Sequence, residues 1–179
     1  MRNDISLELA SRLTEQVKTA FENGSLLDAV TPVTQDLLKF WFMGPYTEER
    51  SKNFHEGQKQ SILNIIYLHE VLQVTTVEEI YRQVAPDLLA ECNLSDLAKE
   101  KYRIPKYAVK MATGTGKTWV MHALLLWHLL IARYEEQEER SGRYTQNFLI
   151  VAPGLIVYDR LKDAYCGRLK ENCTERDPF

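Results

Sequence analysis

The segment most informative about the fold runs Tyr107-Ala108-Val109-Lys110-Met111-Ala112-Thr113-Gly114-Thr115-Gly116-Lys117-Thr118. Residues 107–111 are typical of a short strand, and the apolar residues that follow indicate a helix from Lys117 to about Tyr134. A glycine-rich turn therefore stands between a predicted strand and the start of a predicted helix. Turns in this setting bind the phosphates of nucleotides, because backbone N–H groups and the helix N-terminus both face the anion.

Each residue type in this turn has a physical reason to hold a nucleoside triphosphate. Gly114 and Gly116 let the backbone pass close to the phosphates and adopt torsion angles that other residues avoid. Lys117 can reach the β and γ phosphates, and the Thr118 hydroxyl can ligate Mg²⁺. The general consensus has glycine at the position of Met111, so the match is incomplete. The predicted cofactors are ATP and Mg²⁺, and their binding residues in the turn are Thr113, Gly114, Thr115, Gly116, Lys117 and Thr118.

The sequence on both sides of the turn extends this pattern. Residues 147–152 form a second predicted strand, and Pro153-Gly154 leads into a predicted helix over residues 155–170. A strand, a loop and a helix that repeat in this order open a parallel sheet covered by helices, so the predicted fold class is α/β. Before the turn, apolar residues at helical spacing predict helices that cover residues 5–21, 36–42, 53–74, 77–84 and 94–100.

Boundary signals divide this helical part of the chain. Asn23-Gly24 is a predicted helix stop, Thr34 is a candidate cap for the helix that follows it, and Gly44-Pro45 ends that helix. Residues 1–50 are therefore interpreted as an N-terminal helical extension. The pattern weakens in residues 75–102, which are interpreted as an insertion or a linker.

Composition narrows the class of protein. The chain has 179 residues, of which 45% are hydrophobic and 26% are charged, as in a folded domain rather than a disordered chain. No apolar run reaches the ~20 residues of a membrane span, and the N-terminus has no signal-peptide core. Three cysteines without a Cys-x-x-Cys pair are expected to be free thiols, so we expect a cytoplasmic protein without a membrane partner. The net charge of -3 gives no support to a broad basic surface for nucleic acid, and a local groove stays open.

The phosphate turn, with the Met-Ala that precedes it, resembles the turn of superfamily 2 helicases and translocases. Those proteins carry an upstream glutamine whose amide pairs with adenine, and Gln58 stands in that position before a predicted helix. They also carry a proline-containing turn that contacts one nucleic-acid strand, and residues 151–157 resemble it. The resemblance implies adenine recognition by Gln58 and nucleic-acid binding by Pro153, Gly154 and Arg160.

A closer resemblance covers most of residues 31–165. In their order and spacing, several segments resemble the N-terminal part of the Res subunit of type III restriction enzymes. These segments are residues 40–42, 50–58 and 65–71, the phosphate turn, and residues 151–155. Such subunits combine two RecA-like motor domains with a C-terminal endonuclease domain, and their ATP hydrolysis drives communication along DNA before cleavage. The resemblance implies double-stranded DNA and a methyltransferase (Mod) subunit as partners.

The fold that this resemblance implies is an incomplete RecA-like P-loop NTPase domain in residues 51–179, preceded by the helical extension. An ATPase of this class needs a second carboxylate motif for Mg²⁺ and for water activation, and none follows the phosphate turn in the sequence. We therefore expect the first part of motor domain 1 of a DNA-dependent translocase, cut before that motif. No catalytic residue is predicted, and the chain alone is expected to be catalytically silent.

Other interpretations stay open. The chain is alternatively a non-catalytic module that binds a nucleotide or DNA, another superfamily 2 helicase, or a different P-loop enzyme such as a kinase. Stable triphosphate binding favours the non-catalytic module. A comparison of ATP with GTP affinity separates the kinase from the translocase, because Gln58 would be irrelevant to base choice in a kinase. Trp41, Trp119 and Trp127 are predicted to be core residues rather than base-stacking surfaces, and the four histidines lack metal-ligand spacing.

Overall fold

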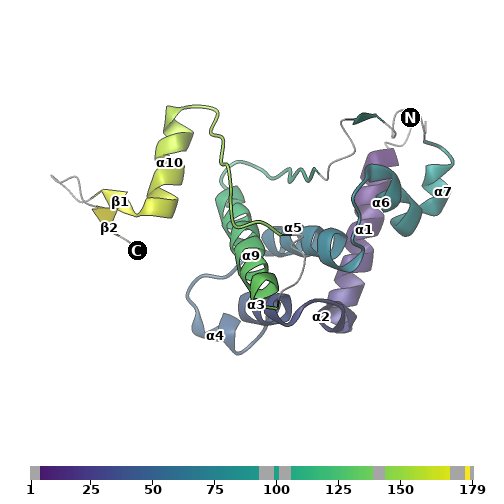
Figure 1. The fold of residues 1–179 in the computed structure, drawn as a ribbon, viewed down its shortest axis with the longest axis horizontal. Helices are drawn as coiled ribbons and strands as arrows, with labels where there is room; N and C mark the ends of the chain where they lie inside the picture. The colour runs from purple at the N-terminus through teal and green to yellow at the C-terminus, as the bar shows by residue number, and fades with distance from the viewer. Residues whose placement is uncertain (1–4, 93–98, 101–105, 139–143, 170–175, 178–179) are drawn as a thin grey trace. The chain divides into compact units, whose positions relative to one another are not determined.

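The computed structural model describes residues 5–92, 99–100, 106–138, 144–169 and 176–177 (Figure 1). The chain divides into two compact units, Met1–Tyr144 and Thr145–Phe179, which are described separately below. Most of the described residues are helical. Among the described helices, none is long and apolar enough to cross a membrane.

The first unit begins with four helices whose ends follow local signals. They are α1 (Ile5–Glu22), α2 (Ser25–Ala29), α3 (Pro32–Phe42) and α4 (Tyr46–Glu49). Gly24 separates α1 from α2 with a φ of 84°, which lies in the left-handed region that favours glycine. The helix stop predicted at Asn23-Gly24 is therefore confirmed.

The start of α3 corrects one prediction. Thr31 caps this helix, and its side chain accepts a hydrogen bond from the Thr34 backbone N–H. Pro32 then occupies the first helical position, where its missing N–H loses no intrahelical bond. The prediction that Thr34 is the cap was therefore wrong, because the proline allows the helix to begin earlier.

The central helices of the first unit confirm one prediction and shorten another. They are α5 (Glu56–Ile66), the π-helical segment η1 (Tyr67–Val71), α6 (Val77–Val84) and α7 (Pro86–Leu89). The single helix predicted over residues 53–74 is shorter and changes its winding at Tyr67. The helix predicted over residues 77–84 is confirmed, and a capping box fixes its start. The helix predicted over residues 94–100 lies largely outside the described residues.

The core of the first unit lies where α9 (Lys117–Gln137) packs against α5 and α3 (Figure 1). Trp127 is fully buried at its centre and Trp41 is nearly so, as predicted for both. Burial of this apolar surface is the main favourable term in the stability of the unit. Further buried apolar side chains of the core are Val17, Leu26, Leu38, Ile62, Leu63, Ile66 and Ile131.

A polar cluster of Thr31, Thr34, Glu70 and Trp127 lies inside this core. The Thr34 hydroxyl donates to Glu70 Oε2 at 2.6 Å, and its oxygen accepts from Trp127 Nε1 at 2.9 Å. Glu70 Oε1 also accepts a hydrogen bond from the Thr31 backbone N–H. Because these buried polar groups pair with one another, the cluster joins α3, η1 and α9 without leaving them unsatisfied.

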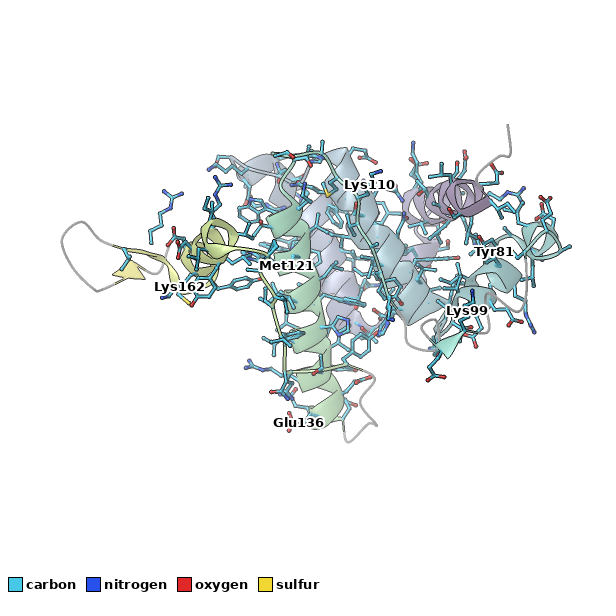
Figure 2. The ribbon with its side chains drawn as sticks, turned by 90° about the horizontal axis from the view of Figure 1, so that it is seen from above. Tyr81, Lys99, Lys110, Met121, Glu136 and Lys162 are labelled. Carbon is cyan, nitrogen blue, oxygen red and sulfur yellow. The ribbon has the colours of Figure 1, made fainter. Side chains whose placement is uncertain are left out.

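The two predicted strands do not form strands in this structure. Residues 106–111 pair with no neighbouring strand, and neither do residues 147–152. Exposure along the first segment still alternates, since Tyr107 and Val109 pack against the helical core whereas Lys110 is exposed (Figure 2). A parallel strand requires hydrogen-bonded neighbours, and the described residues supply none here, so they do not confirm the α/β prediction.

The second unit contains α10 (Leu155–Cys166), β1 (Arg168–Leu169) and β2 (Arg176–Asp177). The two short strands pair in antiparallel fashion. The predicted helix begins at residue 155 as expected, but it ends earlier, before Gly167, whose φ is 80°. Apolar residues that suit a buried strand and helix face are exposed within this unit, and they include Leu149, Val151, Leu155 and Ile156.

Candidate nucleotide-binding site

The turn before α9 has the backbone conformation for which glycine is suited. Gly114 has a φ of 82°, and Gly116, the N-cap of α9, has a φ of 75°. Both values lie in the left-handed region, where a side chain would cause strain. The Thr115 hydroxyl donates to the Ala112 carbonyl oxygen at 2.7 Å and closes the turn. Residues 112–116 therefore form a tight turn at a helix N-terminus, where free N–H groups favour anions.

Lys117 brings a positive charge to this turn. Its Nζ donates to the carbonyl oxygens of Met111 at 2.9 Å and of Ala112 at 2.8 Å. The exposed side chain thus folds back over the turn instead of extending into solvent. Because bonds between two charged groups are stronger, an anionic acceptor can replace these carbonyls.

The start of α5 is bonded to the same turn. Gln58 Nε2 donates to the carbonyl oxygens of Thr115 at 3.1 Å and of Gly116 at 3.3 Å. His55 Nε2 donates to the Thr115 carbonyl at 2.8 Å, while its Nδ1 accepts from the Gln58 backbone N–H. Gln58 Oε1 accepts from the His55 backbone N–H at 3.0 Å, which completes the capping box of α5. The structure therefore brings Gln58 together with the predicted phosphate turn.

The Gln58 amide faces the turn backbone and not the solvent. The residue is 6% exposed, and its Nε2 contacts two turn carbonyls. A Cβ atom at Gly116 would lie 2.2 Å from Gln58 Nε2, which is too close for any real side chain. Gly116 is therefore required by its φ and by this approach. The motif predicts the first reason, and only the structure reveals the second.

Trp119 corrects a prediction made for the core. The residue is 60% exposed, whereas the other two tryptophans are buried. Its ring meets Phe54 edge-on, with centroids 6.4 Å apart and planes at 87°, and Phe54 in turn contacts Trp41. Sequence periodicity missed this because apolar residues occupy several faces of α9. The position of Trp119 in the first turn of α9, two residues after Lys117, is the sequence signal that could have indicated its exposure.

Among the described side chains that donate to carbonyl oxygens at the turn, Lys117 carries a permanent positive charge. His122 lies one turn further along α9, with its ring centroid 6.4 Å from that of Trp119. Burial lowers the pKa of His122 from its ordinary value, which favours the neutral ring. Within the described residues, no three His, Cys, Asp or Glu side chains group as a metal site. Mg²⁺ binding by Thr118, in the first turn of α9, stays a prediction.

The residues predicted to contact nucleic acid belong to the second unit. Gly154 is the N-cap of α10, and its carbonyl accepts from the Tyr158 N–H at 2.9 Å. Pro153 and Arg160 are both exposed. The helix start at this position is the predicted one, and the first N–H groups of a helix are suitable donors for a phosphate.

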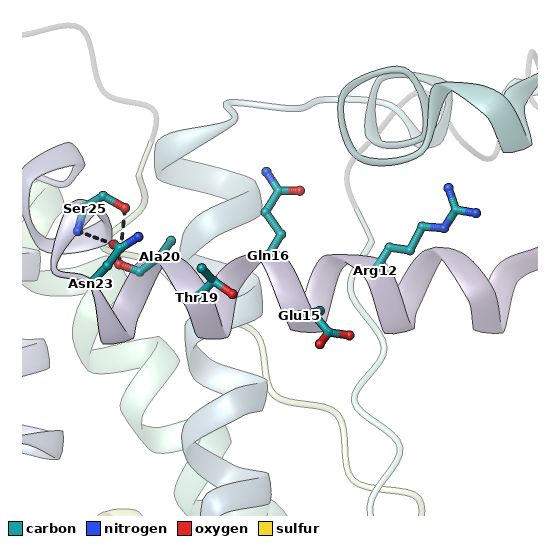
Figure 3. Close-up of a pocket in the computed structure, with 7 residues that line it drawn as sticks. All are labelled: Arg12, Glu15, Gln16, Thr19, Ala20, Asn23 and Ser25. Atoms are coloured by element: carbon teal, nitrogen blue, oxygen red, sulfur yellow. Dashed lines mark hydrogen bonds between the residues drawn. The ribbon is translucent and has the colours of Figure 1, made fainter.

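A shallow hollow of about 400 Å³ lies on α1 and the turn after it (Figure 3). Arg12 at its edge pairs with Glu8 at 2.9 Å and with Asp87 at 2.6 Å. None of the predicted site residues lines this hollow, so it gives the nucleotide prediction no support. Its lining residues are Arg12, Glu15, Gln16, Thr19, Ala20, Asn23 and Ser25.

Comparison with known proteins gives one match. The family model described as type III restriction enzyme, res subunit, matches residues 51–177, which is more than half of the chain. No curated protein and no solved structure matches. The matched family belongs to the class of DEAD-like helicase domains, and it implies a RecA-like P-loop fold. The chain belongs to the family of type III restriction enzyme res subunits. This confirms the resemblance found in the sequence and indicates a helicase-like ATPase of type III restriction systems.

Proposed function

We propose that this chain binds ATP and Mg²⁺ at the turn of residues 112–116, as the ATP-binding part of a DNA-dependent translocase in a type III restriction system. Lys117 Nζ carries the proposal: it lies 2.8 Å from the Ala112 carbonyl oxygen of the turn and 2.9 Å from the Met111 carbonyl oxygen just before it, at the start of a helix. A cation and helix N–H groups thus share one anion-binding surface. Members of the family generally use ATP and Mg²⁺, which suits such a surface.

Each part of the proposed site has its own role. Lys117 exchanges its carbonyl acceptors for the β and γ phosphates, and Thr118 ligates Mg²⁺. Gln58 holds the turn against the start of α5 through two carbonyls. Recognition of adenine by Gln58 therefore requires that one of these amide bonds be exchanged for a bond to the base.

The wider assignment follows from the family. We infer that residues 51–179 are the first part of motor domain 1, with residues 1–50 as a helical extension, because the family match begins at residue 51. Helices α1 and α3 of the extension pack against α5 and α9, so both parts share one core. Family members generally work with DNA and a methyltransferase, which are the proposed partners. Pro153, Gly154 and Arg160 are the proposed DNA contacts.

Calorimetric titration of the chain with ATP and Mg²⁺ tests the phosphate site. Lys117→Ala is expected to lower the affinity roughly 10- to 100-fold, because it removes charge-assisted bonds to two phosphates. Lys110→Ala is the matched control, since this exposed lysine on the segment before the turn should not contact phosphate (Figure 2). Circular dichroism checks that both variants keep their helices. Wild-type affinity in Lys117→Ala would remove the proposal.

A further inference from the structure

The surroundings of the phosphate turn include an aromatic surface that phosphate binding does not use. Trp119 is 60% exposed, although Val120 and Ala123 on the same helix are buried. A large flat apolar ring is unfavourable in water, and proteins use such rings to stack on ligands. The exposed indole is therefore a candidate for a binding surface.

Three contacts fix Trp119 beside the turn. Its backbone N–H donates to the Gly116 carbonyl at 2.9 Å. Its Cδ1 lies 3.5 Å from the point that a Cβ of Gly116 would occupy, and Gln58 Nε2 lies 2.2 Å from the same point. Phe54 contacts the ring edge-on, with centroids 6.4 Å apart, and so supports it from the side of α5. The indole and the Gln58 amide thus both adjoin Gly116, which directly precedes Lys117.

We propose that Trp119 stacks on the base of the nucleotide whose phosphates the turn binds. This inference rests on the proposed phosphate site and adds a base-binding surface to it. A nucleotide held by its phosphates places its base a short distance from the turn, and Trp119 is the exposed flat ring that adjoins the turn on α9. Stacking removes apolar surface of both rings from water, and every base has a face that can stack.

The position of Gln58 strengthens this assignment. Its amide contacts the turn backbone and is nearly buried, so it offers no flat surface to a base. Because stacking is tolerant of base identity, Trp119 contributes affinity without choosing between adenine and guanine. Base affinity is therefore the function of Trp119 in this site, whereas the Gln58 amide positions the turn.

Titrations with ATP and with inorganic tripolyphosphate, each with Mg²⁺, test the stacking. Trp119→Ala is expected to lower the affinities for ATP and GTP by about tenfold and to leave that for tripolyphosphate unchanged, since tripolyphosphate has no base. Trp119→Phe, which keeps a flat ring, should retain most of the ATP affinity. Leu126→Ala is the matched control, because Leu126 is an exposed apolar residue of the same helix. ATP, but not tripolyphosphate, should also change the tryptophan emission of the wild-type chain, and this change should be absent in Trp119→Ala.

The outcomes distinguish this inference from the phosphate site on which it rests. Wild-type affinity of Trp119→Ala for ATP, with loss of affinity in Lys117→Ala, overturns the stacking and keeps the phosphate site. An equal loss for ATP and tripolyphosphate also overturns it, because Trp119 would then act on the shape of the turn. If Trp119→Ala lowers the affinity for a single-stranded oligonucleotide and not that for ATP, the stacking on the nucleotide base is overturned and the ring is assigned to nucleic acid. If the wild-type chain binds neither ATP nor tripolyphosphate, both proposals fail.

Discussion

Gln58 and Gly116 illustrate how two residues far apart in the sequence depend on each other. The Gln58 amide reaches the turn only because residue 116 has no Cβ, which would lie 2.2 Å from Nε2. The same amide accepts from the backbone N–H of His55 and so also caps the start of α5. One side chain therefore satisfies polar groups of the helix start and of the turn at once.

Replacement of Gln58 by alanine separates a positioning role from adenine recognition. Because its amide holds the turn, we expect Gln58→Ala to lower the affinities for ATP, GTP and tripolyphosphate by one common factor, about 3- to 10-fold. Gln60→Ala is the control, since the Gln60 amide contacts Asn64 and Thr14 instead of the turn. A loss confined to ATP in competition titrations would show that the amide moves to adenine.

At the residue scale, the sequence predicts what a local motif dictates. The left-handed glycines and the place of Lys117 follow from the turn motif, and the resemblance to superfamily 2 proteins singles out Gln58 as a nucleotide-binding residue. The spacing of His55 and Gln58 is that of a capping box, which could have predicted that the amide is already engaged. The exposure of Trp119 could not be predicted, because it depends on which neighbours α9 meets in space.

At the scale of the elements, the polar cluster explains how three helical segments keep their relative positions. Thr34, Glu70 and Trp127 come from α3, η1 and α9, and apolar packing alone would let such surfaces slide. Hydrogen bonds in a buried site have strict directions, so they specify one arrangement. The π-helical winding of η1 occurs at this point, where Glu70 joins the cluster.

Glu70→Ala tests the contribution of this cluster to stability. The variant leaves the Thr31 N–H and the Thr34 hydroxyl without their buried acceptor, so the free energy of unfolding should fall by about 2 to 4 kcal/mol. Glu78→Ala is the matched control, because this exposed ion pair with Arg82 contributes only about 0.3 to 0.5 kcal/mol. Urea denaturation followed by circular dichroism measures both. Equal losses in the two variants would contradict a structural role for the cluster.

The elements also show where sequence patterns are sufficient. The helix stop at Gly24 and the start of α6 at Val77 were predicted correctly, and the structure shows a capping box at the second of them. The segment predicted as a strand at residues 107–111 alternates in exposure, but alternation alone does not supply a partner strand. Pairing in a parallel sheet is a contact between distant segments, so a local pattern indicates the buried face and not the neighbour.

At the scale of the whole molecule, the first unit encloses a cluster of aromatic and histidine rings. His128 lies with its ring centroid 4.8 Å from Trp127, 5.2 Å from His69 and 5.2 Å from Tyr144. Burial, and secondarily the charge of His69, lower the pKa of His128 to about 4. The ring is therefore neutral in the folded chain at physiological pH.

This pKa predicts a loss of stability in mild acid. An unfolded histidine takes up its proton near pH 6.5, whereas folded His128 does so only near pH 4. The free energy of unfolding is therefore unaffected by His128 above pH 6.5. It falls by up to about 2 kcal/mol, after allowance for solvent screening, as the pH is lowered to 4. His128→Phe should remove this part of the pH dependence in urea denaturation series. If the free energy of unfolding changes with pH equally in the wild-type chain and in His128→Phe between pH 6.5 and 4, the assignment to His128 is refuted.

The bonds from His55 and Gln58 to the phosphate turn have a mechanical consequence. A polyphosphate that reshapes the turn must either break these bonds or move the first residues of α5 with it. Helix α5 in turn packs along α1, so a displacement of its start would reach the N-terminal helices through this contact. Occupancy of the turn would then be communicated to residues that no nucleotide touches.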